Sequence, residues 1–168
     1  MRISERTIFK EEQQFRENWL WAIILVAGAS GIVGIFISGF STKAFDEKNF
    51  IIVFVAVILL ITILFYLFYS TKLETQVTEK AILYRWLPYM RNFKKIGKDE
   101  IEKTELKKAP SFERGFKTVS GYGQAHVVNA GKGIQLVLKS SKKIFVGTAE
   151  PYLFKKAMDN MMATEIKN

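Results

Sequence analysis

The stretch Phe50 to Tyr69 constrains this chain more than any other, because its roughly 20 residues include no charged residue and no Gly, Pro or Asn. At about 1.5 Å rise per residue, a helix of this length matches the hydrocarbon core of a bilayer, which is about 30 Å thick. A buried helix of a soluble protein usually keeps a polar stripe, whereas this segment offers apolar side chains on every face. We therefore predict a transmembrane helix over residues 50–69.

A second apolar run, Trp19 to Phe40, lies just upstream and predicts another transmembrane helix, so that residues 19–69 form a membrane hairpin. A cleaved signal peptide is the alternative, because the Ala-Gly-Ala segment at 27–29 resembles a processing site. The apolar run continues past that site, beyond the usual h-region of about 7 to 15 residues. Residues 1–18 are interpreted as a cytoplasmic juxtamembrane segment, either a short interfacial helix or a frayed terminus.

The first span differs from the second because it carries small residues at helical spacing. Small residues let another helix approach closely. The predicted helix-packing residues are Ala27, Gly31, Ser30, Gly34 and Ser38. This small face is expected to pack against the second helix of the hairpin. The alternative is a homo-oligomer in which the first transmembrane helix faces its own copy.

The distribution of charge predicts the orientation. The formal net charge is +9, and Lys and Arg outnumber Asp and Glu mainly after Tyr69. Four basic residues precede the first span, two lie in the linker Ser41 to Asn49, and many follow the second span. The positive-inside rule then places both termini in the cytoplasm of a multi-pass protein of the inner (cytoplasmic) membrane.

After the second span the pattern changes to short segments rich in β-forming residues, so residues 70–168 are expected to form one α+β cytoplasmic domain. An amphipathic helix should follow from Pro151 to about Thr164. Its apolar face is expected to consist of residues at helical spacing: Leu153, Phe154, Ala157, Met158, Met161 and Met162. The predicted strands are Leu73 to Glu79, Ala81 to Leu87, Phe93 to Ile96, Ile101 to Leu106, a strand around Val119, Ala125 to Asn129, Ile134 to Lys139 and Lys143 to Val146.

The order of these segments resembles that of bacterial membrane proteins with a pleckstrin-homology-like (PH-like) domain. The resemblance rests on LETQVTEKAILYRW after the second span, on DEIEKTEL, and above all on GKGIQLVLKSSKKIFVGTAEPYLFKKAM. It covers about residues 50 to 164. It implies an antiparallel β-sandwich or partly open barrel of about six or seven strands, capped by the C-terminal helix. The family is of largely unknown function, so the resemblance does not by itself indicate a function.

Groups that carry catalytic or metal chemistry are sparse. The chain has no cysteine, and its single histidine, His126, lies in a predicted strand with no Asp or Glu nearby in sequence. We expect that histidine to be structural or exposed, and we expect no catalytic residue, metal, cofactor or enzymatic activity. Basic positions remain as possible contacts to anionic lipid headgroups: Lys94, Lys95, Lys98, Lys107, Lys108, Lys142 and Lys143.

Three functional hypotheses follow. The first is a non-enzymatic integral membrane protein whose cytoplasmic domain is a protein-interaction or assembly module, with an unknown protein partner and no nucleic acid. The second is a module that binds or senses anionic lipids. The third is a small channel or transporter subunit, which is the weakest because neither predicted span contains an ionisable group.

Overall fold

The computed structural model describes residues 6–15, 18–42, 47–110, 115–128 and 131–163, without the side chains of residues 18–20, 39–42, 47 and 48. The chain forms two compact units. One unit is the segment Phe15–Ser70, and the other is a domain that combines residues up to Gln14 with residues from Thr71 onward. The domain is therefore built from both flanks of the segment between them.

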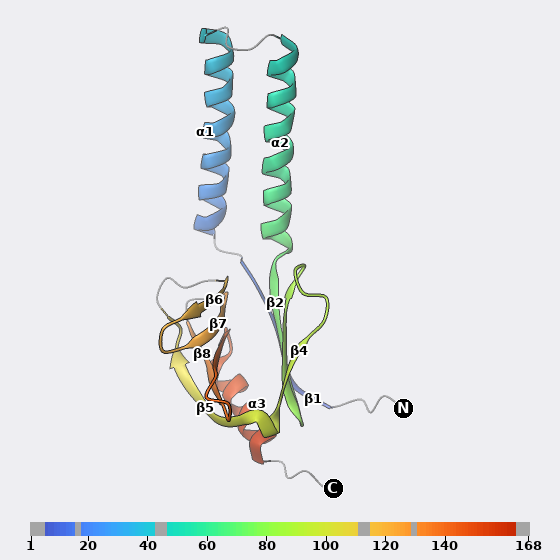
Figure 1. Ribbon diagram of the computed structural model, residues 1–168, viewed down its shortest axis with the longest axis vertical. Coiled ribbons are helices and arrows are strands. Elements are labelled where there is room, and N and C mark those ends of the chain that lie inside the picture. Colours follow the sequence, from blue (N-terminus) through green and yellow to red (C-terminus); the bar gives the residue numbers. More distant parts are fainter. Residues whose placement is uncertain (1–5, 16–17, 43–46, 111–114, 129–130, 164–168) are drawn as a thin grey trace. The chain divides into compact units, whose positions relative to one another are not determined.

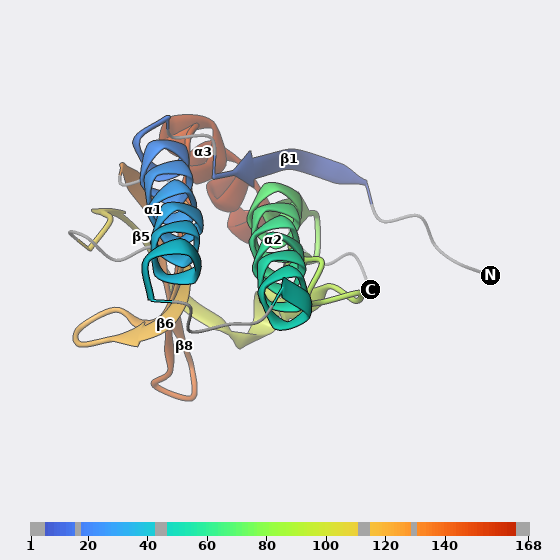
Figure 2. The same ribbon diagram turned by 90° about the horizontal axis from the view of Figure 1, so that it is seen from above.

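The first unit is a hairpin of two long helices, α1 (Asn18–Thr42) and α2 (Glu47–Ser70), which run side by side (Figures 1 and 2). Aromatic side chains of the two helices are in contact, and the ring centroids of Trp21 and Phe65 are 5.0 Å apart. Both helices are long and apolar enough to cross a membrane, and none of either apolar stretch is buried within the chain. A helix in the core of a soluble protein would be mostly covered, so the predicted pair of membrane-length helices is confirmed.

The second unit contains two β-sheets and one α-helix (Figure 1). The first sheet is antiparallel, and its strands in spatial order are β1 (Thr7–Gln14), β2 (Lys72–Thr78), β3 (Ala81–Leu87) and β4 (Lys94–Gly97). A 3₁₀ turn, η1 (Lys98–Glu100), leads to the second sheet. The spatial order there is β5 (Ile101–Lys108), β8 (Lys132–Leu138), β9 (Lys143–Thr148), β7 (Gly123–Val127) and β6 (Gly115–Val119).

Three sequence-based predictions about this unit are wrong. The described residues form nine strands instead of about six or seven. The prediction had left open a sandwich or a partly open barrel, and the two sheets are not closed into a barrel. The strands are not all antiparallel, because β7 and β9 pair in parallel from Gln124–Ile144 to His126–Val146. Residues 7–14 form strand β1 rather than an interfacial helix. The other predicted strands are confirmed within a few residues of their expected bounds.

The C-terminal helix α3 (Pro151–Ala163) begins at Pro151 as predicted, because proline at the first helical position loses no internal hydrogen bond. The Thr148 hydroxyl accepts a hydrogen bond of 3.0 Å from the Glu150 amide just before the helix. Helix α3 contacts strands of both sheets. Its buried side chains are Phe154, Ala157, Met158 and Met161, whereas Leu153, which we expected on the apolar face, is exposed.

Strand β1 connects the first sheet to β9 and α3 through alternate side chains on one face. The Phe9 ring stacks on that of Phe154 at 5.1 Å. The Glu11 carboxylate accepts a 2.7 Å hydrogen bond from the Ala149 amide, and the Gln13 amide donates one of 2.8 Å to the Gly147 carbonyl. Because successive strand residues point to opposite faces, these three residues share the inner face of β1. The segment before the hairpin is thus part of the domain core.

We predict that Phe9→Ala lowers the free energy of unfolding of the domain by about 3 to 5 kcal/mol, because it leaves a cavity beside the Phe154 ring. Lys10→Ala is the matched control on the outer face of the same strand, where its ammonium makes only an exposed ion pair of 3.4 Å with Glu12. That control should change stability by less than about 1 kcal/mol. Urea unfolding of the full chain in detergent, followed by protease resistance, measures both. Equal stability of the two variants would contradict the place of β1 in the core.

Candidate functional site

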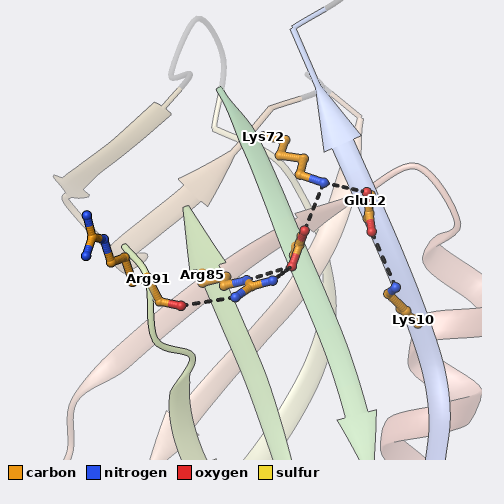
Figure 3. Close-up of polar contacts among 6 residues, drawn as sticks. Lys10, Glu12, Lys72, Arg85 and Arg91 are labelled. Atoms are coloured by element: carbon orange, nitrogen blue, oxygen red, sulfur yellow. Dashed lines mark hydrogen bonds and ion pairs between the residues drawn. The ribbon is translucent and has the colours of Figure 1, made fainter. Parts of the chain in front are cut away.

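The outer face of the first sheet carries a network of ion pairs across β1, β2 and β3 (Figure 3). Glu12 is the cross-strand partner of Glu74, and Glu74 is the partner of Arg85. The Lys72 ammonium lies 2.9 Å from Glu12 and 3.0 Å from Glu74, so it bridges the two carboxylates. Arg85 reaches the second oxygen of Glu74 at 2.6 Å. The two carboxylates are thus opposite each other on neighbouring strands, and the cations Lys72 and Arg85 compensate their charges.

Glu74 is the centre of this network, because it contacts both Lys72 and Arg85. Its side chain is buried, with only 4 % of the residue exposed. Burial opposes ionisation of its carboxyl group, but hydrogen bonds from Arg85 and Lys72 outweigh it and hold the pKa of Glu74 below its usual value. The carboxylate is therefore charged at neutral pH. A buried carboxylate with two cations at hydrogen-bond distance fixes the relative positions of neighbouring strands.

Arg85 also holds the β3–β4 loop, residues 88–93. It donates a 3.0 Å hydrogen bond to the Arg91 carbonyl, and its guanidinium lies 4.2 Å from the centroid of the Phe93 ring. At the other side of the loop, the Thr71 hydroxyl donates a 3.3 Å hydrogen bond to the Tyr89 hydroxyl. The Tyr89 side chain is nonetheless 65 % exposed. The loop is thus fixed at two points and presents an aromatic ring to its surroundings.

His126 lies between the two sheets among aromatic rings. Its Nδ1 accepts a 2.9 Å hydrogen bond from the Trp86 indole, and its ring lies 4.5 Å from that of Tyr84 and 4.8 Å from that of Phe116. Because Nδ1 is an acceptor, the neutral ring carries its proton on Nε2. Nε2 is buried and has no hydrogen-bond partner among the described residues. Burial, together with the nearby charge of Lys94, lowers the pKa of His126 to about 4. This histidine is therefore a neutral member of the core at physiological pH.

The predicted basic positions do not gather into one patch. Lys107 and Lys108 end β5, where the register places Lys108 beside Lys132. The other end of that sheet holds Lys142 and Lys143, and a hydrogen bond from the Lys139 amide to the Glu100 carbonyl brings η1, which begins at Lys98, to the same end. Lys94 and Lys95 lie on β4, where the Lys94 ammonium is 5.7 Å from the Phe116 ring centroid. The fold therefore does not bring all seven lysines together into a single headgroup pocket.

The predicted helix-packing residues of α1 do not all have the same surroundings. Ala27, Gly28 and Gly31 line an apolar groove of about 350 Å³ between α1 and α2. A methyl group added to Gly28 would lie 3.6 Å from the Cδ1 atom of Ile61 on α2. A methyl group on Gly31 or on Gly34 would meet no described atom within 4 Å. The Ser30 hydroxyl donates to the Val26 carbonyl of its own helix at 2.8 Å, and Ser38 is exposed. Part of the small-residue face thus borders α2, and part of it is open.

Sequence reasoning missed Gln13, Glu74, Arg85 and Tyr89. Gln13 acts through a hydrogen bond to Gly147, which is 134 residues away in sequence, so no local pattern marks it. Glu74, Arg85 and Tyr89 act through the β2–β3 register and the contact of the following loop with Thr71, which only the folded β2–β3 hairpin brings together. No group of three or more His, Cys, Asp or Glu side chains that could hold a metal occurs in the described part of the chain. The sequence matches none of the protein-family models, and it resembles no curated protein or solved structure closely enough to count as a match.

We predict that His126 makes the domain less stable as the pH falls from 6.5 toward 4. The unfolded chain takes up a proton near the ordinary pKa of 6.5, whereas the folded chain resists protonation until about 4. The unfolded state therefore binds more protons within this range, and stability is lost by up to about 1.4 kcal/mol per pH unit as the pH decreases. Above 6.5 both states are neutral and the full stability is present.

His126→Asn tests this prediction, because its side-chain oxygen can still accept the Trp86 hydrogen bond while the variant cannot titrate. Unfolding of both chains is measured at pH 6.5 and pH 5, so that the contributions of carboxylates cancel in the comparison. The wild-type chain should lose more stability than the variant over this interval. The same loss in both chains would show that His126 is not the titrating group.

Proposed function

We propose that this is a two-span protein of the inner membrane whose β domain lies in the cytoplasm. The pairing of β1 with β2 supports this topology, since residues before α1 and after α2 belong to one folded unit and must share a compartment. An even number of crossings satisfies that requirement. The excess of Lys and Arg after Tyr69 favours the cytoplasmic side for that compartment.

We further propose that the domain is a divergent PH-like module. The succession of β8, the turn at 139–142, β9 and the helix that begins at Pro151 supports this proposal. The parallel β7–β9 pair and the additional strand β1 depart from the family pattern implied by the sequence.

The function we propose is that of an assembly module, in which copies of the chain associate through α1 and the β domains are thereby brought together to engage a protein partner. The observation that carries this proposal is the open part of the small-residue face. Ala27, Gly31 and Gly34 are spaced i, i+4 and i+7 and so lie on one stripe of the helix. Ala27 and Gly31 border the apolar groove, and a methyl group on either Gly31 or Gly34 would meet no described atom within 4 Å. Small residues exposed in a bilayer allow close approach of a second helix.

Oxidative crosslinking in native membranes tests the association, since the chain has no cysteine of its own. Gly34→Cys should give a covalent dimer. Leu60→Cys on α2 is the control, because that side chain is 56 % exposed and three of its four neighbours one turn away, Val57, Ile63 and Leu64, are bulky. In a second variant, Gly34→Leu should reduce the oligomer seen in mild detergent, because its side chain obstructs close approach.

Only monomer with Gly34→Cys, or equal crosslinking at Leu60→Cys, would contradict association through α1. A reporter fused after Asn168 checks the topology separately. It should be accessible from the cytoplasm and protected from reagents added outside the cell.

A further inference from the structure

The β3–β4 loop lies at the end of the first sheet from which the chain continues into the hairpin. Ser70 is the last residue of α2, and Thr71 is followed directly by β2. Leu87, which precedes the loop, is the cross-strand partner of Lys72. The hydrogen bond from Thr71 to Tyr89 then ties the loop to the residue that follows α2.

The position of the loop near the end of α2 follows from the connectivity of the chain alone. Consecutive Cα atoms are about 3.8 Å apart, so Thr71 cannot be far from the end of α2. If α2 crosses the bilayer to Ser70, Thr71 lies at the membrane surface, and the Tyr89 hydroxyl 3.3 Å from its side chain must lie there too. The loop is therefore brought to the headgroup region by a covalent link and a hydrogen bond.

The chemistry of the loop suits that region. Tyrosine is enriched at membrane interfaces, where its ring contacts acyl chains and its hydroxyl remains among polar groups. Tyr89 is 65 % exposed, and the neighbouring Pro88, Arg91 and Asn92 are exposed as well. Figure 3 shows the Arg91 guanidinium directed away from Glu12 and Lys72, while its carbonyl accepts the hydrogen bond from Arg85. The backbone of the loop is held by the sheet, and its ring and cation are presented outward.

We infer that the β3–β4 loop is a membrane-contact element that inserts Tyr89 among lipid headgroups and places Arg91 against their phosphates. The partner is the lipid surface itself. Arginine beside a phosphate makes charge-assisted hydrogen bonds, and an anionic leaflet attracts a cation that lies near its surface. These residues differ from the lysines predicted from sequence, which the fold distributes over several regions. The inference rests on the proposed membrane insertion of α2.

Single-cysteine labelling of the full chain in lipid vesicles tests the inference. An environment-sensitive fluorophore is attached at Asn92→Cys, which keeps Tyr89 and Arg91 intact. Glu79→Cys carries the same label at the opposite end of β2 and β3, and Leu60→Cys reports on α2. Lipids with a spin label on the headgroup or in the acyl chain act as quenchers, in zwitterionic vesicles and in vesicles that contain phosphatidylglycerol.

Headgroup spin labels should quench the fluorophore at Asn92→Cys at least about twofold more strongly than that at Glu79→Cys, because the loop lies at the interface. Adding Tyr89→Ala or Arg91→Gln should weaken the quenching at Asn92→Cys, and the loss with Arg91→Gln should be larger in phosphatidylglycerol vesicles. No quenching at Asn92→Cys, or equal quenching at Glu79→Cys, would overturn the inference if the acyl-chain label quenches Leu60→Cys. Absence of quenching at Leu60→Cys would instead overturn the membrane insertion of α2.

Discussion

The pairing of β1 with β2 is the interaction on which the rest of this structure depends. It joins residues on the two sides of a helical hairpin, with Gln14 opposite Lys72. Closing so long a loop costs conformational entropy, although this cost grows only slowly with loop length. The register from Thr7–Thr78 to Gln14–Lys72 supplies the compensating hydrogen bonds. The hairpin is thereby an insertion within a sheet, and its two ends leave the domain from neighbouring strands.

Both faces of β1 contribute to this connection, by different physical means. The inner face combines one aromatic ring, Phe9, with two polar side chains, of which Gln13 donates a hydrogen bond to the Gly147 carbonyl and Glu11 accepts one from the Ala149 amide. The outer face contributes Glu12 to the alternating charges around Glu74. The same network extends through Arg85 to the loop that carries Tyr89. The segment before the hairpin and the proposed lipid contact are therefore connected by neighbouring strands of one sheet.

The sequence predicted the parts of this fold that have a local physical signal. The helices were evident from continuous apolar runs, and β3 was predicted at its observed bounds, where the alternating residues Ile82, Tyr84 and Trp86 are all buried. Strand β1 has no such signal, because its inner positions include Glu11 and Gln13, whose partners lie more than a hundred residues away in sequence. The parallel pairing of β7 with β9 could not be predicted for a similar reason, since strand order depends on long-range packing. The sequence shows which positions are lysines, but it does not show that the fold places them in several separate regions of the domain.

The most direct test of the central claim is a disulfide between cysteines placed at Lys10 and Gln76, which are cross-strand partners on the outer face of β1 and β2. The chain contains no other cysteine that could compete. Oxidation in native membranes should join these two positions within one chain, whereas cysteines at Lys10 and Lys80, beyond the end of β2, should stay reduced. Failure of the Lys10–Gln76 pair to form, in a chain that is otherwise folded, would contradict a domain built from both flanks of the hairpin.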